Sequence, residues 1–183
     1  LLIIFLFLRH LRATLIPLVT IPISLGATFL ALRIFGLSIN TITLLAMVLA
    51  VGLVVDDAIV VLENIFRYRE QGLDARTAAK KGAQEIGFAI IAMTCTLMSV
   101  FLPLVFVSDI TGTLLREFAI TLASAVFFSG IVALTLSPLM CAHLLKHVPR
   151  ENALGLKIER AIAWLEHSYL RLLRIIFVRR HIL

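Results

Sequence analysis

Two neighbouring carboxylates, Asp56 and Asp57, are the residues of this 183-residue sequence whose type and placement could do chemistry. Apolar residues precede the pair and continue past it from 58 to 62, so the two acids interrupt a long apolar run. A charged carboxylate is costly to bury in a membrane, and acids at such positions usually belong to ion pathways or proton relays. The pair therefore predicts proton translocation, provided that a helix holds both residues at depth in a bilayer.

Other reactive constellations are weaker. Cys141, His143 and His147 lie near one another, and histidines four apart can bind a metal, but histidines at a membrane interface beside a lysine are far commoner. An aspartyl protease needs two aspartates that share a proton and come from two facing elements of the fold. Consecutive aspartates on one helix point about 100° apart, so this pair does not fit such an enzyme. No phosphate-binding glycine loop or zinc-protease motif occurs. We therefore expect no cofactor, no metal and no enzymatic activity.

The elements that must position the aspartates are transmembrane helices. Hydrophobic residues make up 61% of the chain and charged residues 15%, whereas soluble domains are roughly 45–50% apolar. About 20 apolar residues in a helix cross the hydrocarbon layer. Segments of that kind run over about 13–32, 41–66, 86–108 and 118–145, with Ser38 and Asn40 as candidate N-caps of the second. The predicted fold class is an all-α membrane protein, a polytopic transmembrane helix bundle.

The remaining segments extend this bundle. Residues 1–8 are expected to end a truncated transmembrane helix, and residues 175–183 to begin a further one, so the chain reads as a piece of a longer membrane protein. Between them, 151–174 shows apolar residues at helical spacing with basic residues around the wheel. This pattern predicts a cytoplasmic amphipathic helix on the membrane surface, and a partner-binding helix in water is the alternative.

The basic residues predict the orientation. Two lie at 9 and 12, five between 67 and 81 and eight between 146 and 180, whereas the alternate side carries only Arg33 and Arg116. By the positive-inside rule, the side of the membrane that carries most of the lysines and arginines is the cytoplasmic side. Cys95 and Cys141 both fall in apolar runs and are expected to be buried free thiols.

The depth of the aspartates has two interpretations. On a helix over 41–66, Asp56 lies roughly 24 Å from the cap and therefore near the middle of the bilayer. Because residues 34–55 alone are long enough to cross the bilayer, the pair could instead lie at the cytoplasmic interface of the membrane, facing Arg67 and Arg69. Glu63 stands four residues before Arg67 and is expected to form a solvated or interfacial pair with it rather than to belong to a relay. Since no lysine or arginine lies at membrane depth between 13 and 145, the aspartates must be protonated, hydrated or paired with a cation from outside.

Around these residues the sequence resembles the resistance–nodulation–division (RND) efflux transporters, especially the hydrophobe/amphiphile, multidrug-exporting branch that includes AcrB and MdtB. The stretch 52–64, which contains the aspartates, carries the most specific likeness. The other matching stretches are 12–17, 36–41, 47–50, 116–119, 134–138 and 140–142. The resemblance covers nearly the whole chain and places it in the N-terminal half of such a pump.

The resemblance implies a proton-driven antiporter of the bacterial inner membrane, exporting drugs or other amphiphiles. It implies a homo- or hetero-trimer that works with a periplasmic adaptor and an outer-membrane channel. Asp56 and Asp57 match the family's proton-relay pair, whose basic partners lie in the other half of the pump. The fragment alone is then expected to be inactive. The alternatives are a metal or lipid exporter of the same superfamily, or an inactive membrane-embedded remnant or scaffold.

Overall fold

The computed structural model describes residues 11–107 and 110–145, and every regular element among them is helical. In chain order these are α2 (Leu11–Ile34), α3 (Thr41–Glu70), α4 (Ala75–Phe101), the 3-10 helix η1 (Leu102–Phe106) and α5 (Ile110–Leu144). The segments predicted over 1–8, 151–174 and 175–183 lie outside the described residues. The expected all-α fold class is confirmed for the part that is described.

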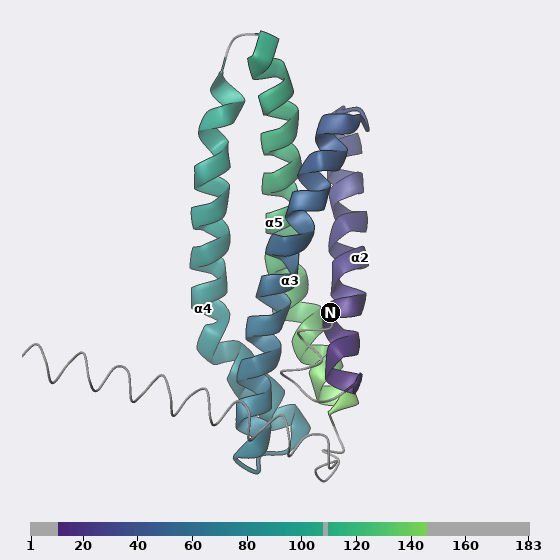
Figure 1. The fold of residues 1–183 in the computed structure, drawn as a ribbon. Coiled ribbons are helices and arrows are strands. Elements are labelled where there is room, and N and C mark those ends of the chain that lie inside the picture. The colour runs from purple at the N-terminus through teal and green to yellow at the C-terminus, as the bar shows by residue number, and fades with distance from the viewer. Residues whose placement is uncertain (1–10, 108–109, 146–183) are drawn as a thin grey trace, which may run out of the picture. The chain divides into compact units, whose positions relative to one another are not determined.

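The four long helices run side by side, with the α2–α3 and α4–α5 connections at one end and the α3–α4 connection at the other (Figure 1). α5 packs against each of the other three helices, and α3 also contacts both α2 and α4. α3 and α5 therefore form the central pair, with α2 and α4 on either side (Figure 1). The helix that carries the aspartates thus lies in the middle of the bundle.

The start of α3 is determined by local side-chain chemistry. The side chain of Asn40 accepts hydrogen bonds from the backbone N–H groups of Ile42 and Thr43, and the Thr43 hydroxyl accepts one from the Asn40 N–H. This capping box satisfies donors that the first helical turn would leave unpaired. Of the two predicted caps, Asn40 rather than Ser38 is therefore the N-cap of α3. At the other end the chain leaves the helix through Gly72, whose φ of +88° is a left-handed conformation that favours glycine.

Several helix ends differ from the apolar segments read from the sequence. α3 continues to Glu70 rather than 66, α4 begins at Ala75 rather than 86, and α5 begins at Ile110 rather than 118. Residues 110–117, which lie between the apolar segments predicted over 86–108 and 118–145, are therefore helical. The physical reason is that the backbone hydrogen bonds of a helix can continue through polar residues where the helix leaves the hydrocarbon layer of the membrane. Asp74 supports the early start of α4 by accepting a hydrogen bond from the Thr77 N–H at 3.2 Å. In contrast, α4 ends at Phe101, short of the expected 108, and is followed by the 3-10 helix η1.

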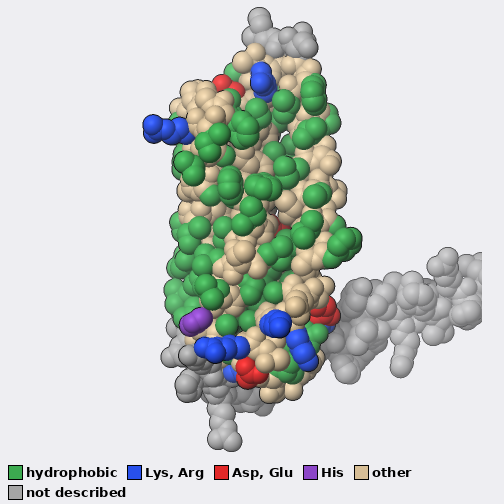
Figure 2. Space-filling model, turned by 180° about the vertical axis from the view of Figure 1, so that it is seen from behind, with side chains coloured by type: hydrophobic (Ala, Val, Ile, Leu, Met, Phe, Trp, Pro, Cys, Tyr) green, Lys and Arg blue, Asp and Glu red, His purple; other side chains and the backbone are tan. Residues whose placement is uncertain are grey.

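The surface between the helix ends is apolar. Figure 2 shows hydrophobic side chains over the middle of the bundle, with lysine and arginine side chains gathered toward its two ends. Large side chains such as Val48 and Phe88 are 71% and 82% exposed, which suits contact with lipid rather than water. All four long helices are long and apolar enough to cross a membrane. The chain is therefore a multi-pass membrane protein.

Small residues let α3 and α5 approach closely. Ala46 and Ala50 of α3 are buried against Leu122 and Ala125 of α5. Small residues at such crossings allow helix backbones to pack tightly within a membrane. Gly52 of the same helix, in contrast, is exposed, and a Cβ atom built there would have no neighbour within 4 Å.

Candidate functional site

Asp57 lies at the buried centre of the α3–α5 contact. Its side chain is only 3% exposed, and the hydroxyl of Ser129 on α5 donates a hydrogen bond of 2.7 Å to its Oδ2 atom. The same hydroxyl lies 3.2 Å from the carbonyl oxygen of Val54, one turn earlier on α3. At a rise of 1.5 Å per residue, Asp57 is about 24 Å from Thr41 and about 20 Å from Glu70. The carboxylate is thus far from both ends of its helix.

Asp56 has a different environment. It is exposed on the surface of the four-helix unit and has no hydrogen bond or ion pair with the described residues. The cause is helix geometry, because consecutive side chains point about 100° apart, so burying one carboxylate against α5 turns the other away. The structure therefore keeps the predicted pair on one helix without bringing the two side chains to the same contact.

Close packing with α4 fixes the neighbourhood of Ser129. A Cβ atom added to Gly130 would lie 2.7 Å from the hydroxyl oxygen of Thr94, so the glycine allows α4 to lie directly against α5 at this level. Thr94 is 9% exposed, and its hydroxyl has no hydrogen-bond partner among the described residues. Neither hydroxyl was predicted from the sequence. The signal for Ser129 is its place beside Gly130 in the middle of an apolar segment, and Thr94 has no glycine beside it.

The basic side chains lie toward the helix ends, away from Asp57. Those described are Arg33, Arg67, Arg69, Arg76, Lys80, Lys81 and Arg116. The two arginines that could have met the aspartates at an interface have other partners, since Arg67 binds Glu85 and Arg69 donates to the Leu73 carbonyl at 2.7 Å. Within the part of the chain that the structure describes, neither aspartate has a cationic partner.

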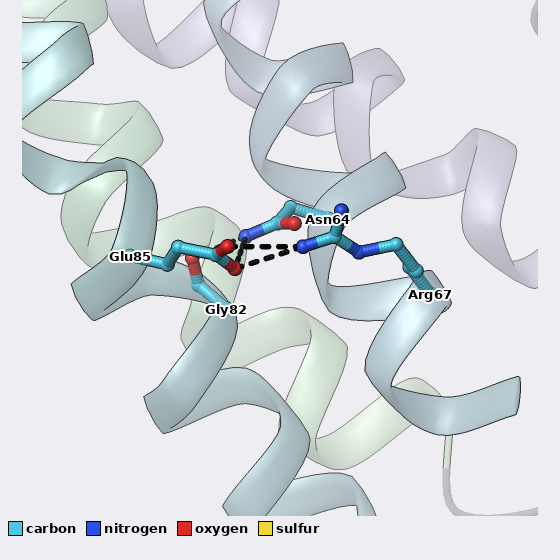
Figure 3. Close-up of polar contacts among 4 residues, drawn as sticks. All are labelled: Asn64, Arg67, Gly82 and Glu85. Atoms are coloured by element: carbon cyan, nitrogen blue, oxygen red, sulfur yellow. Dashed lines mark hydrogen bonds and ion pairs between the residues drawn. The ribbon is translucent and has the colours of Figure 1, made fainter. Parts of the chain in front are cut away.

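A polar cluster joins α3 to α4 near the α3–α4 connection (Figure 3). Arg67 lies 3.0 Å from both carboxylate oxygens of Glu85. The Asn64 side chain donates to the Gly82 carbonyl at 2.9 Å and to Glu85 at 3.0 Å. The predicted Glu63–Arg67 pair is therefore wrong, because the arginine reaches across to α4 instead of along its own helix. Asn64, part of the 52–64 motif, has a structural role here.

A second link joins α3 to α5 at the opposite end of the bundle. The side-chain amide of Asn40, which caps α3, donates a hydrogen bond to the carboxylate of Glu117 on α5. α3 therefore meets α5 through polar side chains at its beginning and at its centre, and α4 near its end. These contacts fix the register at which Asp57 is presented to Ser129.

The cysteines and histidines form no site in the described part of the chain. Cys95 is exposed on α4, contrary to the expectation of burial, whereas Cys141 is buried, and both thiols are free. The Nδ1 atom of His143 lies 2.9 Å from the Leu139 carbonyl oxygen of its own helix, and His147 lies outside the described residues. Among the residues that are described, no three histidine, cysteine or acidic side chains are grouped to hold a metal.

Comparison with known proteins gives two kinds of match. A profile of the AcrB/AcrD/AcrF family matches residues 1–183. Multidrug resistance protein MdtC of Salmonella arizonae is 48% identical over 169 residues, which cover 92% of this chain and 16% of that protein. Multidrug resistance protein MdtC of Proteus mirabilis is 52% identical over 145 residues, which cover 79% of this chain and 14% of that protein. The chain thus spans a small part of the length of these relatives.

Proposed function

Because this chain belongs to the AcrB/AcrD/AcrF family of RND transporters, we propose that it is part of a pump that exchanges protons for amphiphilic drugs. The names of its MdtC relatives support multidrug export as the activity of the whole protein. The proposed pump lies in the bacterial inner membrane and is a homo- or hetero-trimer. It works with a periplasmic adaptor and an outer-membrane channel.

The observation that carries the proposal is the buried carboxylate of Asp57 at mid-helix, held by the hydroxyl of Ser129. A carboxyl group at this depth can be neutral or charged, and each form favours different surroundings. Asp56 adds a second carboxyl on the neighbouring face of the same helix. We assign these two residues to proton translocation.

A cation from outside the described residues completes the proposed relay. Neither aspartate meets a lysine or arginine within the part described, and the exposed side chain of Asp56 is open to another helix. A cation approaching that face would favour the charged carboxylates, and its withdrawal would favour proton uptake. On this proposal the 183 residues by themselves transport nothing.

Coupling to export follows from the same contact. A proton that binds Asp57 removes a charge from the α3–α5 interface, so two packings of these helices would differ in proton affinity. A proton can shift such an equilibrium only through this difference in affinity. Proton binding and helix rearrangement then drive one another.

The proposal is tested by drug efflux from cells that carry the full-length pump. Asp57→Asn and Asp56→Asn each remove a titrating group while keeping its size, so we expect normal membrane abundance and loss of export to the level of pump-free cells. In Asp57→Asn the amide oxygen of the new side chain can still accept the Ser129 hydrogen bond, which supports correct folding.

Glu63→Gln is the matched control, since this exposed acid of the same helix has no hydrogen bond or ion pair within the described residues. We expect this variant to pump normally. Normal efflux by both aspartate variants at equal abundance would overturn the relay assignment.

A further inference from the structure

We propose that Ser129 is a positioning residue for Asp57, holding its carboxyl group against α5 in both protonation states. This inference rests on the proposed relay function of Asp57 and adds a residue of α5 to the machinery. Ser129 is 2% exposed and Asp57 is 3% exposed, so their contact is shielded from surrounding solvent or lipid. Within the described part of the chain, the Asp57 side chain therefore relies on Ser129 for its hydrogen bond.

The two acceptors near the Ser129 hydroxyl give it a partner in either state. A serine hydroxyl donates one hydrogen bond and can accept others. When Asp57 is a carboxylate, the hydroxyl donates to Oδ2 over 2.7 Å. When Asp57 carries a proton, its acid O–H can donate to the serine oxygen while the serine hydroxyl turns to the Val54 carbonyl, 3.2 Å away. The contact changes direction without breaking.

Charged groups elsewhere do not provide a competing contact. Asp56 is the charged neighbour of Asp57 on α3, and it points to another face of the helix. The charged side chains described on α2, α4 and α5 lie toward the ends of those helices, and the Cys95 thiol on α4 is exposed. Within the described part of the chain, Ser129 alone donates a side-chain hydrogen bond to Asp57.

The backbone around Ser129 is held from a second side. Gly130 lies against Thr94 of α4 with no room for a side chain, so α5 cannot move toward α4 at this level. On its other side α5 meets α3 through Ser129 itself. The hydroxyl is thus presented to Asp57 by a helix that two neighbours confine.

The test uses the full-length pump in membranes and the carboxyl stretching band in infrared difference spectra between acidic and neutral pH. The band of Asp57 is the one that Asp57→Asn removes. In Ser129→Ala we expect this band to move to higher wavenumber, because the carboxyl group loses a hydrogen bond. Drug efflux should fall on the order of tenfold, as for the loss of a hydrogen bond to a charged group.

Two variants separate the hydroxyl from the helix. Ser129→Thr keeps the hydroxyl and is expected to retain both the band position and efflux. Ser137→Ala removes another buried hydroxyl of α5, one without a hydrogen-bond partner among the described residues, and should change neither. An unmoved band in Ser129→Ala, or a band in Ser129→Thr that moves as it does in the alanine variant, would overturn the positioning role.

The same spectra distinguish this inference from the relay itself. If Asp57→Asn pumps normally while Ser129→Ala moves the band, the relay assignment fails and the positioning contact stands. If Asp57→Asn abolishes efflux while Ser129→Ala leaves band and efflux unchanged, the relay stands and the positioning role fails. If Asp57→Asn removes no band at all, both fail, because a carboxyl that takes up no proton has no second state to hold.

Discussion

The environments of Asp56 and Asp57 show how one step along a helix separates two otherwise equal side chains. Asp57 has a hydrogen-bond donor on α5, while Asp56 has no partner within the described residues. On the proposed relay, proton uptake at Asp57 would be coupled to the α3–α5 contact, whereas the exposed side chain of Asp56 would be available to a group outside the four helices. The two acids should differ in what they sense even though both belong to one proposed relay.

Asp74 gives a residue-scale prediction outside the membrane-spanning segments. The Thr77 hydroxyl, followed by the Thr77 backbone N–H, holds the pKa of the Asp74 carboxyl below its ordinary value of 3.8. A lowered folded-state pKa means that the ionised cap stabilises the fold fully above that ordinary value and loses this effect as the pH falls through the folded pKa. Asp74→Ala should therefore lower the melting temperature at neutral pH, and Asp74→Asn, still an N-cap, should lower it less.

Thermal unfolding of the detergent-solubilised protein over a pH series measures this difference. The difference in melting temperature between wild type and Asp74→Ala should shrink once the pH falls below about 3.8. A melting-temperature difference that stays constant through this pH range would show that the charge of the Asp74 cap does not contribute to stability.

The acid pair of α3 can be singled out from the sequence alone, but the residues that contact these side chains cannot. An acid pair inside an apolar run is visible without a structure, because its cost in a membrane depends on local sequence alone. Ser129 could not be recognised in this way, since it is 72 positions from Asp57 and isolated serines are common in membrane helices. Likewise, Arg67 could reach either Glu63 or Glu85, and only the crossing of α3 and α4 decides between them.

At the scale of the elements, the crossing of α3 and α4 depends on Gly82. A Cβ atom built there would lie 2.8 Å from Cγ1 and 3.0 Å from Cα of Ile65. The first of these atoms belongs to a fully buried side chain, and the second belongs to the backbone. The helices would therefore have to separate to accommodate any larger residue, and the Asn64 hydrogen bond to the Gly82 carbonyl would lengthen.

Gly82→Ala is accordingly expected to destabilise the protein by about 1–3 kcal/mol, the usual cost of overpacking. The fall in melting temperature should exceed that of Asp74→Ala. Adding Ile65→Ala should not restore stability, because the Ile65 Cα and backbone nitrogen remain within 3.1 Å of the new methyl group.

Gly87→Ala provides the control on the same helix, since nothing lies within 4 Å of a Cβ atom there. Equal melting temperatures for wild type and Gly82→Ala would mean that the two helices are not held at this distance.

The helical elements were largely predictable, but their ends were not. Apolar length identifies where a helix can cross the hydrocarbon, and a capping residue such as Asn40 shows where it can begin. The first turns of α4 and α5 lie outside the apolar segments, so apolar length did not predict them, although Asp74 at the start of α4 is a capping residue like Asn40. The packing that makes α3 and α5 the central pair depends on contacts between residues far apart in sequence, such as Ala46 with Leu122 and Ala125.

At the scale of the whole molecule, the charged ends and apolar middle of the bundle predict that its long helices cross the membrane from one side to the other (Figure 2). α3 alone is 30 residues long, or about 45 Å, so its last turns reach beyond a hydrocarbon layer of about 30 Å. The basic residues from 67 to 81 should then lie on the cytoplasmic side and Arg33 and Arg116 on the periplasmic side.

Single cysteines at Gln71 and Thr113 test this topology in a background without Cys95 and Cys141. Both positions are exposed. The neighbouring glycines are less suitable for a cysteine, because Gly72 has a left-handed backbone and a side chain on Gly112 would collide with the Val107 carbonyl. An impermeant thiol reagent should reach the two cysteines from opposite sides of the membrane. Labelling of both from the same side would contradict the proposed orientation.

The hydrogen bond between Ser129 and Asp57 also has a consequence for biosynthesis. The two residues are 72 positions apart, so at roughly 5–20 residues per second the ribosome adds Ser129 on the order of ten seconds after Asp57. During that interval α3 has emerged with its carboxylates and without α5. We expect nascent chains truncated before Ser129 to stay beside the insertion machinery and crosslink to it, and chains that include all of α5 to be released into the lipid.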